Sequence, residues 1–359
     1  RGASATRLRL LCNHADRGTG ASAREDRKGA LRPRCCARCR TRDRCRGPTR
    51  PAPRAHGDVF TPITHKMLQE VFDDGNTAYQ GGGNVSLTGI VINNPWDMLN
   101  YSNDAGFPQW QVFVQADNPE DHGGTALYMM KNSFVDRPHN QYTDEEWTAE
   151  MDRLNLPVGS NGEPLRKGDR VTVNARAPGM FFRGKYNINE QHRKNPEKDF
   201  EIEILERGLV PVAASITLAD LKDSQDEFIF DDSRETGCEY YQASLVHLDN
   251  LLLDDTSSWA AGGTVGVRQG DLTFDMILGL DPMLEAIGTR YDLTTTPFSL
   301  TAILDQEDTD GAPFTNGYRL WLTSADDLHV VPEPGALVLA AVGSILVYPL
   351  VRRRLHRSR

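Results

Sequence analysis

The chain has 359 residues, a length typical of two domains, and a formal net charge of −10. The charge is unevenly divided: residues 1–56 carry 16 Lys/Arg against 4 Asp/Glu, whereas residues 57–351 carry 19 against 46. So acidic a body argues against nucleic acid and anionic lipid as partners, because both are bound mainly through Lys and Arg. The body also has a single cysteine, Cys238, which excludes an internal disulfide framework.

Residues 1–57 form an Arg-rich segment whose composition differs from that of the body. It is built largely from Arg, Ala, Gly and Pro, the products of GC-rich codons, and its run Leu8–Leu11 is interrupted by Arg9. An export signal needs 7–15 consecutive apolar residues, and none are found here. We therefore expect this segment to be disordered or a wrongly framed translation. Cys36 and Cys39 form one CxxC, but no second pair completes a zinc site.

Residues 58–208 are predicted to form a first β module. The alternating apolar residues of 84–92 predict a strand with one buried face, ended by the turn formers that follow. Trp147, Met151 and Leu154 share one face of a predicted helix, with Thr143 as its N-cap. Further strands are predicted at 110–115, 125–130, 170–175, 186–189 and 200–205.

Three strands, a helix and then further strands is the order of an OB-fold, a five-stranded Greek-key barrel. The sequence resembles bacterial extracytoplasmic OB domains in three motifs: TGIV at Thr88–Val91, FVQ at Phe113–Gln115 and GDRVTV at Gly168–Val173. This resemblance implies an OB-like barrel for the module. It implies little about function, because barrels of this kind carry many different binding sites.

Residues 209–330 are predicted to form a second β module. Ile216–Lys222 resembles the start of the first module, and five strand-like runs follow at 238–253, 264–268, 272–278, 298–303 and 318–322. We expect a second OB-like barrel, with a β-sandwich as the alternative. The predicted fold class is therefore mainly β: tandem OB-like five-stranded barrels, plus a C-terminal transmembrane helix.

OB barrels bind polymers on strands two and three and on the neighbouring loops. In module one this region is rich in aromatic and basic side chains, a mixture typical of proteins that stack on bases or sugar rings. The candidate ligand-binding residues are Trp110, Phe113, Tyr128, Arg176, Arg183, Lys185 and Tyr186. The acidic body argues against nucleic acid, and half of the aromatic residues are also needed for the core.

No catalytic or metal-binding pattern is complete. The acidic run Asp305–Gly311 can be aligned with a calcium loop, but Gly317 then stands where the bidentate Glu is required. The body lacks a Gly-x-Ser-x-Gly elbow and a His-Glu-x-x-His pair, and its histidines are dispersed. We predict no enzyme activity, no cofactor and no metal.

Residues 331–359 carry the most specific pattern of the chain. A Val-Pro-Glu-Pro sequence is followed by the 17 uncharged residues Gly335–Val351 and then by three arginines. An apolar run of this length is at the short end of what spans a bilayer, and the arginines are expected to stay cytoplasmic. The residues of the pattern are Val331, Pro332, Glu333, Pro334, Arg352, Arg353 and Arg354.

This combination resembles the PEP-CTERM sorting signal of proteins that an exosortase processes in bacteria that make exopolysaccharide. The resemblance implies a precursor anchored in the inner membrane and then a place at the cell surface or in the matrix. An ordinary C-terminal anchor is the alternative. We therefore expect an exported, non-catalytic surface protein whose partners are an exosortase and exopolysaccharide. Export also requires a signal peptide. We expect that the wrongly framed residues 1–57 stand in the place of the true signal peptide. The functional alternatives are a barrel that binds extracellular oligosaccharide or single-stranded nucleic acid, and an accessory domain of an extracellular hydrolase.

Overall fold

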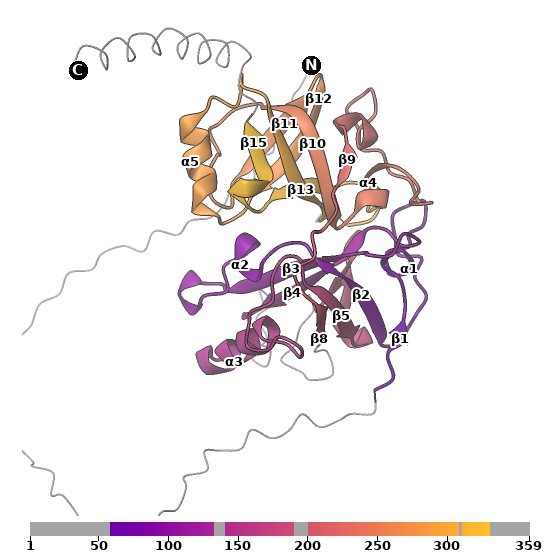
Figure 1. The fold of residues 1–359 in the computed structure, drawn as a ribbon. Coiled ribbons are helices and arrows are strands. Elements are labelled where there is room, and N and C mark those ends of the chain that lie inside the picture. The colour runs from indigo at the N-terminus through magenta and orange to yellow at the C-terminus, as the bar shows by residue number, and fades with distance from the viewer. Residues whose placement is uncertain (1–57, 133–140, 190–199, 309–310, 331–359) are drawn as a thin grey trace, which may run out of the picture. The chain divides into compact units, whose positions relative to one another are not determined.

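The computed structural model describes residues 58–132, 141–189, 200–308 and 311–330 (Figure 1). The predicted sorting pattern, its apolar run and the Arg-rich segment lie outside these residues. No helix in the described ranges is both long and apolar enough to cross a membrane. The described residues form two β-sheets within one compact unit. We call residues 58–208 module 1 and residues 209–330 module 2.

Module 1 contains the first sheet, in the strand order β6-β7-β4-β3-β2-β5-β8. Neighbouring strands of this sheet are antiparallel, except that β7 runs parallel to β4. The short strand β1 pairs in parallel with β2. The strands are β1 (Thr61–Pro62), β2 (Val85–Val91), β3 (Gln109–Gln115), β4 (Gly124–Met130), β5 (Arg170–Ala175), β6 (Met180–Phe182), β7 (Tyr186–Ile188) and β8 (Glu201–Glu206). The helices are α1 (His65–Leu68), α2 (Pro95–Met98) and α3 (Asp144–Asn155), with 3-10 turns η1 (Asn103–Ala105) and η2 (Ala177–Gly179).

Helix α3 confirms the predicted start and the predicted buried stripe. The Thr143 side chain accepts from the Glu146 backbone N–H, and the Glu146 carboxylate accepts in return from the Thr143 N–H. This capping box satisfies two donors that the first turn would otherwise leave unpaired. Trp147, Met151 and Leu154 are buried under the sheet.

Module 2 contains the second sheet, which closes into a barrel through the cycle β10-β11-β12-β14-β13-β10. All pairs in the cycle are antiparallel except β12 with β14. The strands are β9 (Ala214–Ile216), β10 (Ser244–Leu253), β11 (Thr264–Gln269), β12 (Leu272–Leu278), β13 (Phe298–Gln306), β14 (Tyr318–Leu322) and β15 (Leu328–Val330). The helices are α4 (Gly237–Tyr241) and α5 (Pro282–Arg290), with 3-10 turns η4 (Leu218–Asp220) and η5 (Ala325–Asp327). Module 2 is therefore a closed five-stranded barrel, not the β-sandwich considered as the alternative.

Two local predictions in module 2 were wrong. The run predicted as one long strand from position 238 begins instead with helix α4, and β10 starts only at Ser244. Cys238, Glu239 and Gln242 are all buried, a spacing that suits a helix and not a strand with one buried face. Helix α5 was missed, although Asp281 caps it and Pro282 occupies its first turn.

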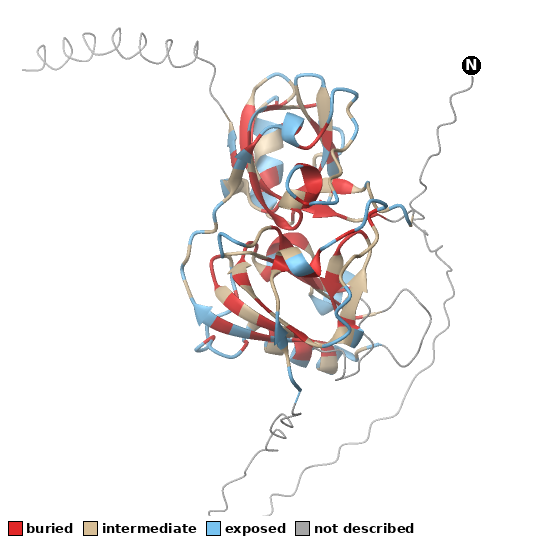
Figure 2. Cartoon of the chain, turned by 90° about the vertical axis from the view of Figure 1, so that its right-hand side faces the viewer, coloured by how far each residue is buried: buried red, intermediate tan, exposed pale blue. Residues whose placement is uncertain are grey.

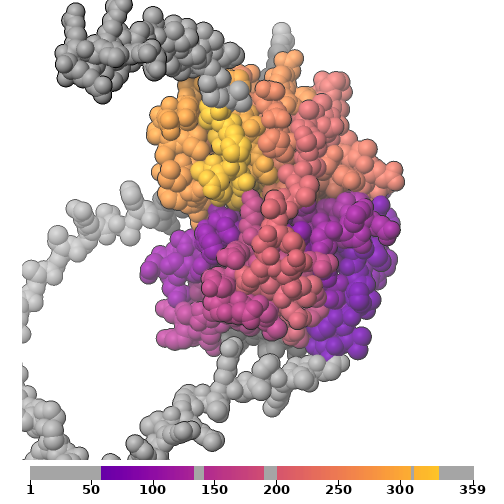
Figure 3. Space-filling view, viewed as in Figure 1, coloured from indigo at the N-terminus to yellow at the C-terminus, as the bar shows by residue number. Residues whose placement is uncertain are grey.

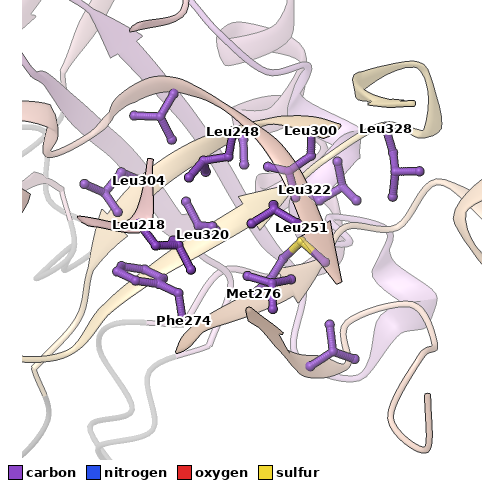
Figure 4. Packing of buried hydrophobic residues seen from close by; sticks show 14 of the residues in the cluster. Leu218, Leu248, Leu251, Phe274, Met276, Leu300, Leu304, Leu320, Leu322 and Leu328 are labelled. Atoms are coloured by element: carbon purple, nitrogen blue, oxygen red, sulfur yellow. The ribbon is translucent and has the colours of Figure 1, made fainter. Parts of the chain in front are cut away.

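The hydrophobic core is divided into three clusters. One fills the barrel of module 2, where leucines from β10, β13 and β14 point toward Phe274 and Met276 (Figure 4). The second lies between the sheet of module 1 and α3. The third, which we call the junction cluster, joins the modules: Ile92, Met98, Phe113 and Ala126 from module 1 and Ala243, Leu245, Ile303 and Trp321 from module 2. Buried residues accordingly continue across the boundary between the modules (Figure 2).

Candidate functional site at the junction of the two modules

Two of the predicted ligand-binding aromatics lie in the core. Trp110 is fully buried against Phe200, and its indole Nε1 donates to Asn155 Oδ1 at 2.9 Å. Phe113 is fully buried in the junction cluster. Neither ring offers a free face to a base or a sugar, so the prediction of Trp110 and Phe113 as stacking residues was wrong for this arrangement. Trp110 and Phe113 lie on opposite faces of β3, and the structure buries both faces of this strand.

The other two predicted aromatics are partly exposed and lie on neighbouring strands of module 1. Tyr128 is on β4. Tyr186, at the start of β7, makes edge-to-face contacts with Tyr79 and Phe182 at centroid distances of 6.0 and 5.2 Å. The Tyr186 ring therefore packs edge to face against two other rings of module 1 and is not one of a row of parallel platforms.

The predicted cations are each paired with a carboxylate. Arg176 contacts Asp58 and Glu201, both at 2.9 Å. Arg183 contacts Glu307 across the junction at 3.3 Å. Lys185 is buried at the junction, so it is not part of an open basic surface. A cation that is already neutralised adds little affinity for phosphate, and the seven predicted residues do not converge on one open face.

Lys185 belongs instead to a buried ionic centre around Asp305. Its Nζ lies 2.8 Å from Asp305 Oδ1, while Arg319 Nη2 and Trp321 Nε1 donate to Oδ2 at 3.0 and 3.2 Å. Asp305 is 1% exposed. Burial alone raises the pKa of this carboxyl, but Lys185 and Arg319 outweigh it and hold the pKa below its usual value. Module 1 thus supplies a cation to a carboxylate that is buried in module 2.

A second buried polar cluster lies around Arg234. The Arg234 side chain pairs with Glu239 at 2.7 Å, and its Nη1 donates to the Gln69 carbonyl of module 1 at 3.0 Å. The Tyr318 hydroxyl donates to Glu239. Burial raises the pKa of Glu239 although Arg234 lowers it, and burial also lowers the pKa of Arg234. No sequence pattern predicts this cluster, because Arg234 stands in a run of charged and polar residues that is typical of an exposed loop.

Backbone and amide groups complete the contact between the modules. The Gln115 amide accepts from the Leu245 N–H and donates to the Val212 carbonyl, both at 2.9 Å. The Gly124 N–H donates to the Gln242 carbonyl at 2.9 Å. These bonds run from β3 and β4 to module 2, so the face of strands two and three in module 1 is occupied by module 2. The space-filling view shows the two modules meeting along a common boundary (Figure 3).

Module 2 presents a different surface on the corresponding strands. Val265, Val267, Phe274, Met276 and Leu278 are buried in the barrel, so the residues that alternate with them on β11 and β12 face outward. These outward residues are Thr264, Gly266, Arg268, Thr273, Asp275 and Ile277. None of these six is aromatic, and Arg268 has Asp254 at 3.7 Å. This face therefore lacks the stacking platforms expected of a single-strand binder.

At the junction, charged side chains of module 1 pair with charged side chains of module 2. Lys185–Asp305 and Arg234–Glu239 are buried pairs, and Arg183 and Glu307 pair at a partly exposed edge of the junction. Within the described ranges, no group of three His, Cys, Asp or Glu side chains could hold a metal ion.

Comparisons with known proteins add no functional assignment. No family model matches the chain, and no curated protein matches it. A structure described as "Molecular basis for abrogation of activation of pro-inflammatory cytokines" aligns over 71% of this chain and 98% of its own, with 9% identity and a TM-score of 0.27. A replication protein A heterotrimer bound to ssDNA aligns over 74% of this chain and 53% of its own, with 11% identity and a TM-score of 0.25. Likenesses this weak support no conclusion about this protein.

Proposed function

We propose that this protein is exported and non-catalytic, and that an exosortase sorts it to the bacterial cell surface or the exopolysaccharide matrix. The observation that carries the proposal is the Val-Pro-Glu-Pro sequence at 331–334, followed by the apolar run Gly335–Val351 and three arginines. The body in front of this pattern is strongly acidic, which suits a hydrated matrix of carbohydrate better than a phosphate surface.

The body proposed for this role is a pair of OB-like barrels. In module 2, helix α5 stands between the third and fourth strands of the closed barrel, which is the OB order. Module 1 repeats this order: β2, β3 and β4, then α3 and β5, with β7 parallel to β4. Each module also begins with a short strand parallel to its first barrel strand, β1 in one and β9 in the other.

The alternative of a polymer-binding barrel has less support. The face of module 1 on which it depends is occupied by module 2, and Trp110 and Phe113 are buried. Both modules bury large cores without a disulfide, and the body's one cysteine, Cys238, is buried as a thiol. This construction suits a passive, durable surface domain, whose stability comes from its packed core.

The proposal is tested by expressing the chain behind a working signal peptide in a bacterium that has an exosortase. We expect the body to be released or surface-bound, with a C-terminus shortened near residues 332–334 when weighed by mass spectrometry. In a strain without the exosortase, and in a variant with Pro332, Glu333 and Pro334 all changed to Ala, the full-length chain should remain in the inner membrane. A matched control changes Pro349→Ala, which should leave processing intact. The proposal would be overturned if a reporter fused ahead of Val331 were found in the cytosol, or if the C-termini were identical in the strains with and without the exosortase.

A further inference from the structure

One histidine of module 1 lies directly against module 2. His122, in the loop between β3 and β4, stacks on Tyr240 of helix α4 with ring centroids 4.6 Å apart and an interplanar angle of 21°. Its Nδ1 lies 3.2 Å from the Tyr240 carbonyl oxygen. Because a carbonyl can only accept, Nδ1 must carry the proton of the neutral ring, and Nε2 is then the unprotonated nitrogen.

His122 Nε2 is shielded from solvent and has no hydrogen-bond partner among the described residues. Protonation would place a charged N–H there without an acceptor, which is costly in a buried position. The carboxylate of the adjacent Asp121 already accepts backbone N–H groups from His65, Lys66 and His122 at 2.8, 2.8 and 2.9 Å. The geometry therefore favours the neutral ring.

The cations around His122 act in the same direction. A Cβ on the adjacent Gly123 would lie 3.1 Å from Arg234 Nη2, so the guanidinium is close to the loop that carries His122. Arg234 Nε and Nη2 themselves lack acceptors among the described residues, although Glu239 pairs with Nη1. Burial first, then Arg234 and Lys66, lower the pKa of His122 to about 4, while the Tyr240 carbonyl and Asp121 raise it in part.

We propose that the contact of His122 with Tyr240 is an acid-sensitive latch: the neutral ring holds the two modules together, and protonation of His122 releases module 2 from module 1. The latch adjoins the Arg234 cluster, which also bonds across the junction to the Gln69 carbonyl. Protonated His122 would be a second cation beside Arg234, and its charge would therefore weaken both the contact of His122 with Tyr240 and the bond of Arg234 to the Gln69 carbonyl. This inference is independent of the proposed route of export.

The test uses the full chain with a protease recognition sequence inserted between Val210 and Pro211, in the connection between the modules. Val210 and Val212 are 85% and 76% exposed, so this connection is accessible to a protease. After cleavage, the halves should elute together in size-exclusion chromatography at pH 7.5 and separate at pH 4.5, with circular dichroism showing that both remain folded. Halves that separate at pH 7.5, or stay together at pH 4.5, would overturn the latch.

His122→Phe keeps an aromatic ring on Tyr240 but removes the titrating nitrogen. The cleaved variant should stay associated at least one pH unit further into the acid range than the parent. Glu239 and Asp305 titrate in the same interface, and the comparison separates their contribution from that of His122. The matched control is His247→Phe, because His247 lies on β10 beside the exposed Asp249 and outside the junction. An identical midpoint of separation in parent and His122→Phe would refute the proposal.

A direct measurement covers the case in which His122→Phe does not fold. The imidazole Cε1–H resonance of His122 is followed by NMR in the cleaved parent while the pH is lowered. The midpoint of this titration should coincide with the midpoint of separation. If the modules separate while His122 is still neutral, the latch lies elsewhere and the proposal fails.

Discussion

The junction should be most sensitive to the loss of the Lys185 ammonium group. Lys185→Met keeps a long side chain of similar volume but leaves Asp305 with only Arg319 and Trp321 as partners. Breaking a buried ion pair by removing one partner costs about 3–5 kcal/mol. Because two donors to Asp305 remain, we expect a loss of about 2–3 kcal/mol in the free energy of unfolding.

Urea denaturation followed by tryptophan fluorescence measures this loss, since the Trp321 indole bonds directly to Asp305. The matched control is Arg268→Met. Arg268 pairs with Asp254 at 3.7 Å, and the two side chains are 38% and 42% solvent-exposed. A surface pair of this kind contributes about 0–1 kcal/mol, so this variant should unfold nearly as the parent does.

A double-mutant cycle with Asp305→Asn then isolates the pair from other effects of each substitution. The double variant should be more stable than the sum of the two single losses predicts. Each single substitution leaves one charge of the pair without its partner, whereas the double variant removes both charges. If Lys185→Met costs no more than Arg268→Met, the ionic centre does not hold the modules together and our account of the junction is wrong.

Three further predictions address the packing, the thiol and the pH dependence. Gly124→Val should separate or unfold the modules, because a Cβ there would lie 2.2 Å from the Ala243 carbonyl oxygen; size-exclusion chromatography and calorimetry measure this. Burial raises the pKa of the Cys238 thiol, so a thiol reagent at pH 8 should label it only after denaturation. His65 and His122 have lowered pKa values in the fold, chiefly through burial, so the unfolded chain binds protons first as the pH falls. Stability should be constant above about pH 6.5 and decrease between pH 6.5 and 4, and urea midpoints across this range test the sign.

Strands such as β2 could be predicted because they bury one face. In β2, Val85, Leu87 and Val91 alternate with partly exposed residues, and the structure places the strand at Val85–Val91. Helix α3 could be predicted for the same reason, from its spacing and its cap. Helix α5 was missed because Gly288 interrupts its apolar stripe, and an internal glycine lowers helix propensity.

The junction could not be predicted from local patterns. Lys185 and Asp305 are 120 positions apart, and nothing in the neighbourhood of either residue indicates its partner. Arg234 and Glu239 are five positions apart, a spacing that predicts no contact on a helix; the closed barrel brings Tyr318 to them, and module 1 brings the Gln69 carbonyl. Such pairings depend on topology, which periodicity along the chain does not contain.

The burial of Phe113 and Lys185 shows why composition alone does not separate a binding face from an internal interface. Both need apolar side chains at the centre, and both use polar and charged side chains for directional contacts around it. Phe113 and Lys185 meet these requirements, and their ligand is the second module of the same chain. The distinguishing feature is the partner's complementarity: Ala243, Leu245 and Ile303 supply apolar contact, and Asp305 supplies the opposite charge. In a protein with two β modules, a face of this kind should therefore be examined first for contact with the neighbouring module, and only then for an external polymer.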